Sequence, residues 1–205
     1  MTNLIKDLIE SRASINHYDT SRPIADDVIA ELVQLATRAP SAYNFQNWKF
    51  IAVRSPQAKL RLQTVAYGQK KVTAAPVTFI ICGTLAAHEQ LPHALQSSVD
   101  TGILAQSVFE GWVTAAQDTH ENNPQLQRDE AFRSASLAAM TLMLAAQGMG
   151  LSTGSMSGFD PLALAREFSL AETDIPVILV TAGYPLPNNW PQKPRKPLNE
   201  VIEFV

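Results

Sequence analysis

The sequence predicts a mixed α/β (α+β) fold: a central mixed sheet flanked by helices, in a single domain over residues 1–205, with an extended C-terminal arm. Three observations predict it. Short runs rich in β-branched residues alternate with segments whose apolar residues recur at helical spacing. Apolar residues make up 46% of the 205 residues, enough for a sizeable core. Five prolines between Pro185 and Pro197 exclude helix and central strand there, which predicts the arm.

The first half of the chain predicts two helices. Apolar residues at positions 4, 5, 8 and 9 follow helical spacing, and Thr2 or Asn3 is a suitable N-cap for this first helix. A second helix is expected over residues 27–38. It should end before Pro40, because the residue before a proline is pushed out of the helical region.

Three helical segments are expected in the second half. The pattern is helical over residues 92–116, and a polar, proline-containing loop or break follows at 120–125. A long helix is expected over 129–147, with Gly148 and Gly150 beyond its end, where glycine suits a left-handed cap. A short helix within 159–168 has Asp160 as its N-cap and Pro161 at its first position.

Three strands are predicted, over residues 48–55, 76–84 and 176–184. The second and third are short, continuous apolar runs, as in buried strands. The last residues, 198–205, are predicted to form a short strand. No G-x-G-x-x-G follows the first strand, which argues against a Rossmann dinucleotide site.

Composition excludes several classes of protein. The formal net charge of −3 favours neither nucleic acid nor an anionic membrane as a partner. The N-terminus lacks the continuous apolar stretch of a signal peptide, and the most apolar segment, 135–150, is too short to cross a bilayer. The single cysteine, Cys82, is expected to be a buried core thiol, so a reducing compartment is predicted. We therefore expect a soluble, cytoplasmic protein.

Small, polar or cationic residues border apolar elements in four segments: SRASIN at 11–16, APSAYNFQNW at 39–48, GLSTGSMSGFD at 150–160 and KPRKP at 193–197. Each alone also fits a simpler role, as a helix end, a turn, a flexible connection or a solvated basic tail. The histidines show no metal-ligand spacing, so surface or structural roles are expected and no metal site is predicted. They are His17, His88, His93 and His120.

Taken in order, the four segments resemble the bacterial nitroreductase family. The family's motifs are R-x-S-x-[RK], then P-S-x-x-N-x-Q-P-W, then G-L-x-T followed by G-F-D, and finally a K-x-R pair. The matching positions are Arg12 and Ser14; Pro40, Ser41, Asn44, Gln46 and Trp48; Gly150, Leu151, Thr153, Gly158, Phe159 and Asp160; and Lys193 and Arg195. The resemblance extends over nearly the whole chain, and the second motif is the most specific.

Two positions depart from the family pattern. Asn16 stands where the family usually has Arg or Lys, which removes a positive charge near the cofactor and affects cofactor affinity and redox tuning. Asn47 replaces a proline, which is expected to change only the stiffness of the loop.

The resemblance implies a nitroreductase-like fold that binds FMN noncovalently at the interface of a homodimer. It implies contacts between the FMN phosphate and Arg12, Lys193 and Arg195, since arginine supplies forked donors to phosphate. The other implied cofactor-binding residues are Ala13, Ser14, Asn16, Pro40, Ser41, Asn44, Gln69, Lys71, Ser155, Ser157 and Gly158. Lys70 is an alternative to Lys71 beside the flavin, and Pro40, Ser41 and Asn44 belong to the same or the partner subunit.

The implied activity is hydride transfer from NADH or NADPH through FMN to a small electron-poor acceptor, such as a nitroaromatic compound or a quinone, with ping-pong kinetics. Flavin carries the chemistry, so no catalytic side chain is expected. Two alternatives stay open. The protein could bind flavin as a sensor or a substrate without being a reductase, or it could be a specialised oxidase or dehalogenase of the same superfamily.

Overall fold

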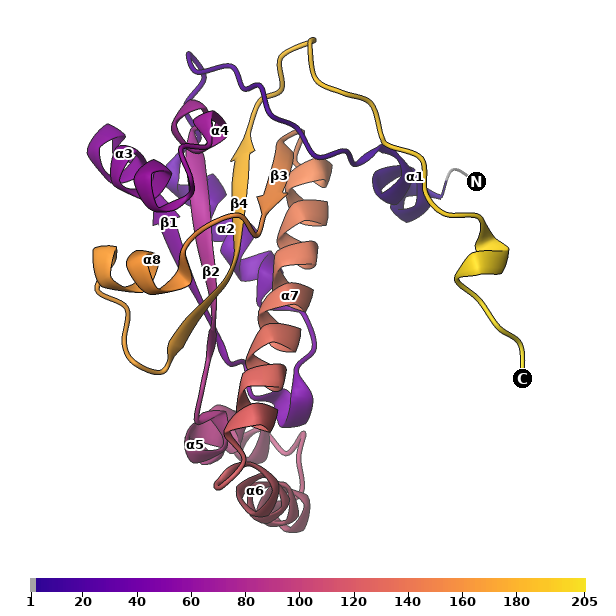
Figure 1. Cartoon of the computed structure of the whole chain (residues 1–205). Coiled ribbons are helices and arrows are strands. Elements are labelled where there is room, and N and C mark those ends of the chain that lie inside the picture. The colour runs from indigo at the N-terminus through magenta and orange to yellow at the C-terminus, as the bar shows by residue number, and fades with distance from the viewer. Residues whose placement is uncertain (1–2) are drawn as a thin grey trace.

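The fold is a four-stranded sheet covered by helices on both faces (Figure 1). The structure is a computed structural model that describes residues 3–205. Its helices are α1 (Leu4–Ser11), α2 (Asp26–Ala36), α3 (Pro56–Val65), α4 (Lys70–Ala74), α5 (Ala87–Asp100), α6 (Gln106–His120), α7 (Pro124–Gly148) and α8 (Pro161–Glu167), with short 3-10 helices η1 (Ala42–Asn44) and η2 (Leu198–Glu200). Its strands are β1 (Trp48–Val53), β2 (Val77–Thr84), β3 (Ser152–Met156) and β4 (Asp174–Gly183).

The strands are ordered β1-β2-β4-β3, and every neighbouring pair is antiparallel. Within residues 3–205, parallel pairing is limited to an isolated bridge between Ser14 and Thr153, which adds the segment after α1 to the β3 edge. The α/β fold class is confirmed, and the four strands of the sheet are all antiparallel rather than mixed.

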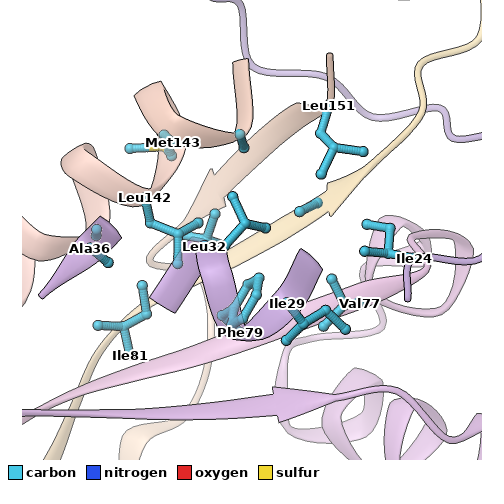
Figure 2. Close-up of a cluster of buried hydrophobic side chains, with 14 of the residues drawn as sticks. Ile24, Ile29, Leu32, Ala36, Val77, Phe79, Ile81, Leu142, Met143 and Leu151 are labelled. Carbon is cyan, nitrogen blue, oxygen red and sulfur yellow. The ribbon is translucent and has the colours of Figure 1, made fainter. Parts of the chain in front are cut away.

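Alternation along β2 divides the core into two parts. Phe79 and Ile81 face α2 and α7, where they pack with residues such as Leu32 and Leu142 (Figure 2). Ile80, between them, faces the opposite layer, formed by α3, α4 and α8. Both faces of the central strands are therefore buried, which explains their continuous apolar sequence.

The predicted helix N-termini are confirmed where a side chain caps the helix. Asn3 accepts a hydrogen bond from the Lys6 N–H at the start of α1, whereas Thr2, the other suggested cap, lies outside the described residues. Asp160 accepts from the N–H groups of residues 162 and 163, with Pro161 at the first position of α8. After α7, Gly150 has the left-handed conformation, with φ +76°.

Other boundaries differ from the predictions. The helical segment expected over 92–116 is two helices, α5 and α6, separated at Gly102, whose φ is +72°. α7 begins at Pro124, so the polar break before it is shorter than expected. Two α-helices and one strand were not predicted, namely α3, α4 and β3, nor were the two 3-10 helices. The prediction of a strand over 198–205 is wrong, because the chain forms the 3-10 turn η2 there and pairs with no strand among residues 3–205.

α1 and the arm lie to one side of the body (Figure 1). α1 buries none of its residues, and residues 190–205 are all exposed. Several of these exposed side chains are large and apolar, among them Leu4, Ile5, Trp190, Leu198 and Phe204. Within residues 3–205, no helix is both long enough and apolar enough to cross a membrane.

Candidate functional site

Three distant parts of the chain border one pocket of about 390 Å³. They are the segment after α1, the turn leading into α4 with α4 itself, and the beginning of the arm. The lining residues are Asn16, His17, Tyr18, Gln69, Lys70, Lys71, Ala74 and Leu186. The structure thus brings together Asn16, Gln69 and Lys71, which were predicted to share a site, and it places both Lys70 and Lys71 at the pocket.

The segment after α1 is held against the edge of β3. The Ile15 N–H donates to the carbonyl of Thr153 at 3.0 Å, beside the Ser14–Thr153 bridge. Tyr18, two residues after Asn16, is buried, and its hydroxyl lies 2.7 Å from the Thr181 hydroxyl. Burial raises the pKa of Tyr18 well above its usual range, so this phenol is a neutral structural group at any physiological pH.

Gln69 connects the pocket to the loop after β3. Its side-chain amide donates to the carbonyl of Gly158 at 2.7 Å. A Cβ on Gly158 would lie 3.3 Å from that amide nitrogen, so the absence of a side chain allows the close approach. Ser157 is exposed beside Gly158, and Ser155 is half-buried on β3. Gly158 and Gln69 are thereby adjacent, although they are 89 positions apart in the sequence.

The pocket is bordered by cations that have no carboxylate partner among residues 3–205. Burial of Lys71 lowers its pKa, and the nearby charge of Lys193 lowers it further, so the arm brings a second cation towards α4. The ion pairs formed within residues 3–205 include none of Arg12, Lys70, Lys71, Lys193 and Arg195. Such a group favours an anionic ligand, which would offset the mutual repulsion.

The other predicted cations, Arg12, Lys193 and Arg195, are not among the residues that line this pocket. Arg12 ends α1, where its backbone N–H donates to Leu8, and Ala13 joins it to the pocket segment. Arg195 folds back on the arm: its guanidinium donates to the Lys193 carbonyl at 3.0 Å and to Gln192 at 3.1 Å.

Pro40, Ser41 and Asn44 lie at the opposite end of the sheet. The next strand begins at Trp48, which pairs with Gly83 near the end of β2, whereas α4 precedes the start of β2. The eight residues of β2 span about 23 Å, so one chain does not bring both groups to one pocket. The Ser41 hydroxyl accepts from the Gln46 N–H at 2.9 Å, which closes the turn locally.

Asn47, at the same end, does more than change loop stiffness. It is buried, and its side-chain amide donates to the carbonyl of Thr84 at 3.2 Å, a bond that a proline side chain cannot make. The residue therefore ties the loop before β1 to the end of β2.

Sequence reasoning missed a histidine pair and a second cavity. His88 and His120 are buried, with ring centroids 6.1 Å apart, although no spacing in the sequence pairs them. Within residues 3–205, no group of three or more potential ligands is placed to hold a metal ion. A larger cavity of about 820 Å³ lies between α7, α8 and the start of β4, and Ser157 is the one predicted cofactor-binding residue among its lining residues.

Comparison with known proteins identifies the family. The family model described as "Nitroreductase family" matches residues 9–184. YodC of Bacillus subtilis, a candidate NAD(P)H nitroreductase by name, is 34% identical over 100% of both chains. MhqN of the same organism, with the same designation, is 32% identical over 97% of both.

Solved structures agree. A B. subtilis nitroreductase candidate, ydfN, superposes with a TM-score of 0.93 at 30% identity, covering 100% of both chains. A nitroreductase candidate from Exiguobacterium sibiricum, solved in complex with FMN, gives a TM-score of 0.90 at 27% identity over 98% of this chain and 97% of that one. The order of motifs, the fold and these matches agree, and the chain belongs to the nitroreductase family.

Proposed function

We propose that this protein is an FMN-dependent oxidoreductase that moves hydride from NADH or NADPH to small electron-poor acceptors such as nitroaromatics or quinones. The observation that carries the proposal is the group of cations at one pocket that form no ion pair within the described residues: Lys70, the half-buried Lys71, and Lys193 near it. Support also comes from YodC and MhqN, whose names indicate NAD(P)H nitroreductases, and from the related structure solved with FMN.

The residues around the pocket fit FMN chemically. Arg12, Lys193 and Arg195 supply the positive charge that a phosphate dianion needs when it is partly desolvated. Ser14, Asn16 and Gln69 supply neutral donors and acceptors for the ribityl chain and the pyrimidine ring. In this assignment Lys71, with Lys70 as the alternative, faces the pyrimidine end of the ring, where a cation favours the reduced cofactor.

The end of β3 and the loop after it complete the proposed flavin site. Ser155, Ser157 and Gly158 run along the ring, and Gln69 fixes this loop by its 2.7 Å hydrogen bond to the Gly158 carbonyl. Bound FMN supplies hydride transfer at its N5 atom, so the protein's part is to bind and orient the reactants, and no side chain is assigned as a catalytic acid or base.

We also propose a homodimer with the flavin at the subunit interface. Pro40, Ser41 and Asn44 match the family's most specific motif, yet they lie at the end of the sheet opposite to Lys71. A second copy of the chain can bring them to the pocket. The exposed apolar side chains of α1 and the arm, such as Ile5 at 69% and Phe204 at 88%, suit a large contact between the copies. Flavin loss and subunit dissociation should then be linked.

The experiment that tests the flavin site replaces both Lys193 and Arg195 by alanine. Lys196→Ala is the matched control, because Lys196 is an exposed cation in the same arm. The double variant should bind FMN more weakly than the wild type does, because charge-assisted contacts are lost. The difference in FMN affinity between the two proteins should change with the salt concentration, because salt screens such contacts. Equal FMN affinity in the double variant and the wild type would remove the pair from the site.

Steady-state kinetics separate a reductase from a flavin sensor. If nicotinamide and acceptor use the same exposed flavin face in turn, double-reciprocal plots at several acceptor concentrations should be parallel. A sensor would hold flavin without turnover of NADH or NADPH in the presence of a quinone or a nitroarene.

A further inference from the structure

The side chain of Asn189 makes four hydrogen bonds that fasten the start of the arm to the pocket. Its oxygen accepts from the backbone N–H of Asn16 at 2.8 Å and of His17 at 2.9 Å. Its amide nitrogen donates to the carbonyls of His17 at 2.8 Å and of Leu186 at 2.9 Å. Both N–H donors and both oxygen lone pairs of this amide are thereby used.

Residues 17–19 and 184–186 form a short two-stranded ribbon, and the hydrogen bonds of Asn189 lie at its end. The Asp19 N–H donates to the Tyr184 carbonyl at 2.9 Å, and the Leu186 N–H donates to the His17 carbonyl at 3.1 Å. Beyond Asn189 the hydrogen bonds of the arm are internal: within residues 3–205, none joins residues 190–205 to the body. Asn189 is therefore the last hydrogen-bonded anchor of the arm before Lys193.

We infer that Asn189 is a positioning residue for the cofactor phosphate: it fixes the point from which the arm carries Lys193 and Arg195 to the pocket. The inference rests on the proposed function, in which those two cations bind the phosphate. Lys193 lies four positions after the anchor, a reach of at most about 14 Å for an extended chain. With the anchor in place, Lys193 stays within electrostatic range of Lys71, whose pKa it lowers.

Removing the anchor lengthens the free part of the arm. Without the Asn189 side chain, the last hydrogen bond to the body is at Leu186, and three further residues must be ordered each time the cations close on the phosphate. The affinity for FMN should fall because this ordering opposes binding, whereas the cations themselves remain present.

The test compares Asn189→Ala with Asn188→Ala. Asn188 is the neighbouring asparagine; it is exposed, and its side chain makes no hydrogen bond within residues 3–205. We expect the FMN dissociation constant of Asn189→Ala to rise about tenfold, and that of Asn188→Ala to stay within about twofold of wild type. Riboflavin, which lacks the phosphate, should bind wild type and Asn189→Ala alike, and this selectivity separates positioning of the arm from general damage to the fold.

A double-mutant cycle completes the test. Adding Lys193→Ala and Arg195→Ala to Asn189→Ala should weaken FMN binding by less than the same two changes do in the wild type, because the cations have already lost their positioning. Additive effects, or equal losses for FMN and riboflavin, would overturn the inference. If Lys193→Ala and Arg195→Ala alone leave FMN affinity unchanged, the proposed flavin site itself fails, so the two failures are distinguishable.

Discussion

Gly154 of β3 lies where an added methyl group would push the pocket segment away from the sheet. A Cβ at this position would lie 2.5 Å from the Ile15 carbonyl oxygen and 3.0 Å from the Thr181 hydroxyl. Since such contacts essentially never fall below 3.0 Å, Gly154→Ala requires the backbone at Ile15 to move by at least 0.5 Å. Ile15 adjoins Asn16, so the displacement reaches the lining of the pocket.

The size of the stability loss in Gly154→Ala follows from overpacking between β3 and the segment after α1. We expect Gly154→Ala to lower the free energy of unfolding by about 1–3 kcal/mol, which for a chain of this size lowers Tm by about 2–12 °C. The gain of about 0.4–1 kcal/mol that alanine brings by restricting the unfolded chain offsets only part of this. Cofactor affinity should also fall, because Ser14 and Asn16 are displaced together.

The matched control is Gly111→Ala. Gly111 is exposed on α6, with nothing within 4 Å of an added Cβ, and alanine should raise the helix stability there by about 0.5–1 kcal/mol. Urea unfolding and FMN titration of both variants measure the two effects. If Gly154→Ala were as stable as Gly111→Ala and bound FMN like the wild type, the segment after α1 would not depend on close contact with β3.

Three further predictions concern single side chains. Burial, with Asp174 as a smaller contribution, raises the pKa of Cys82 to about 12, so iodoacetamide at pH 8 should label it at the rate of global unfolding; rapid labelling of the folded protein would contradict this burial. Burial, and to a smaller extent the charge of Lys193, lowers the pKa of Lys71. The unfolded chain therefore binds the Lys71 proton more tightly than the folded chain does, so charged Lys71 lowers the stability of the fold. This loss of stability is relieved as pH rises through the lowered pKa. Lys71→Gln should therefore raise the Tm of the flavin-free protein at pH 7 and weaken FMN binding, and an unchanged Tm would mean that Lys71 is not desolvated. Asn16→Arg should raise the flavin reduction potential, measured by dye equilibration, because positive charge favours the reduced form; an unchanged or lower potential would place Asn16 away from the pyrimidine end.

The parts of the fold that could be predicted are those set by local pattern. β2 and β4 are buried on both faces and so are continuous apolar runs, and Asp160 is a capping residue wherever it begins a helix. β3 was missed because its sequence, STGSM, has the composition of a turn. It is extended because it pairs with β4, where Gly154 permits the close approach of Ile15 and Thr181.

The residues of the candidate site also divide into those that the sequence could predict and those that it could not. Motif resemblance selected Asn16, Gln69 and Lys71 from two distant segments, and the structure places them around one pocket. Position in the sequence could not show that Ser41 and Asn44 lie at the far end of the sheet, because that depends on which way β1 runs against β2. Nor could it reveal Asn189, because its partners Asn16 and His17 lie more than 170 positions away.

The most direct test of the central claim is an anaerobic titration of the purified protein followed by its flavin absorption. The account predicts FMN, and not FAD, on heat release, bleaching of the flavin band by NADH or NADPH, and its return when a quinone or a nitroarene is added. Protein that carries no flavin after reconstitution with FMN, or flavin that neither nicotinamide bleaches, would contradict the assignment as an NAD(P)H-dependent FMN oxidoreductase.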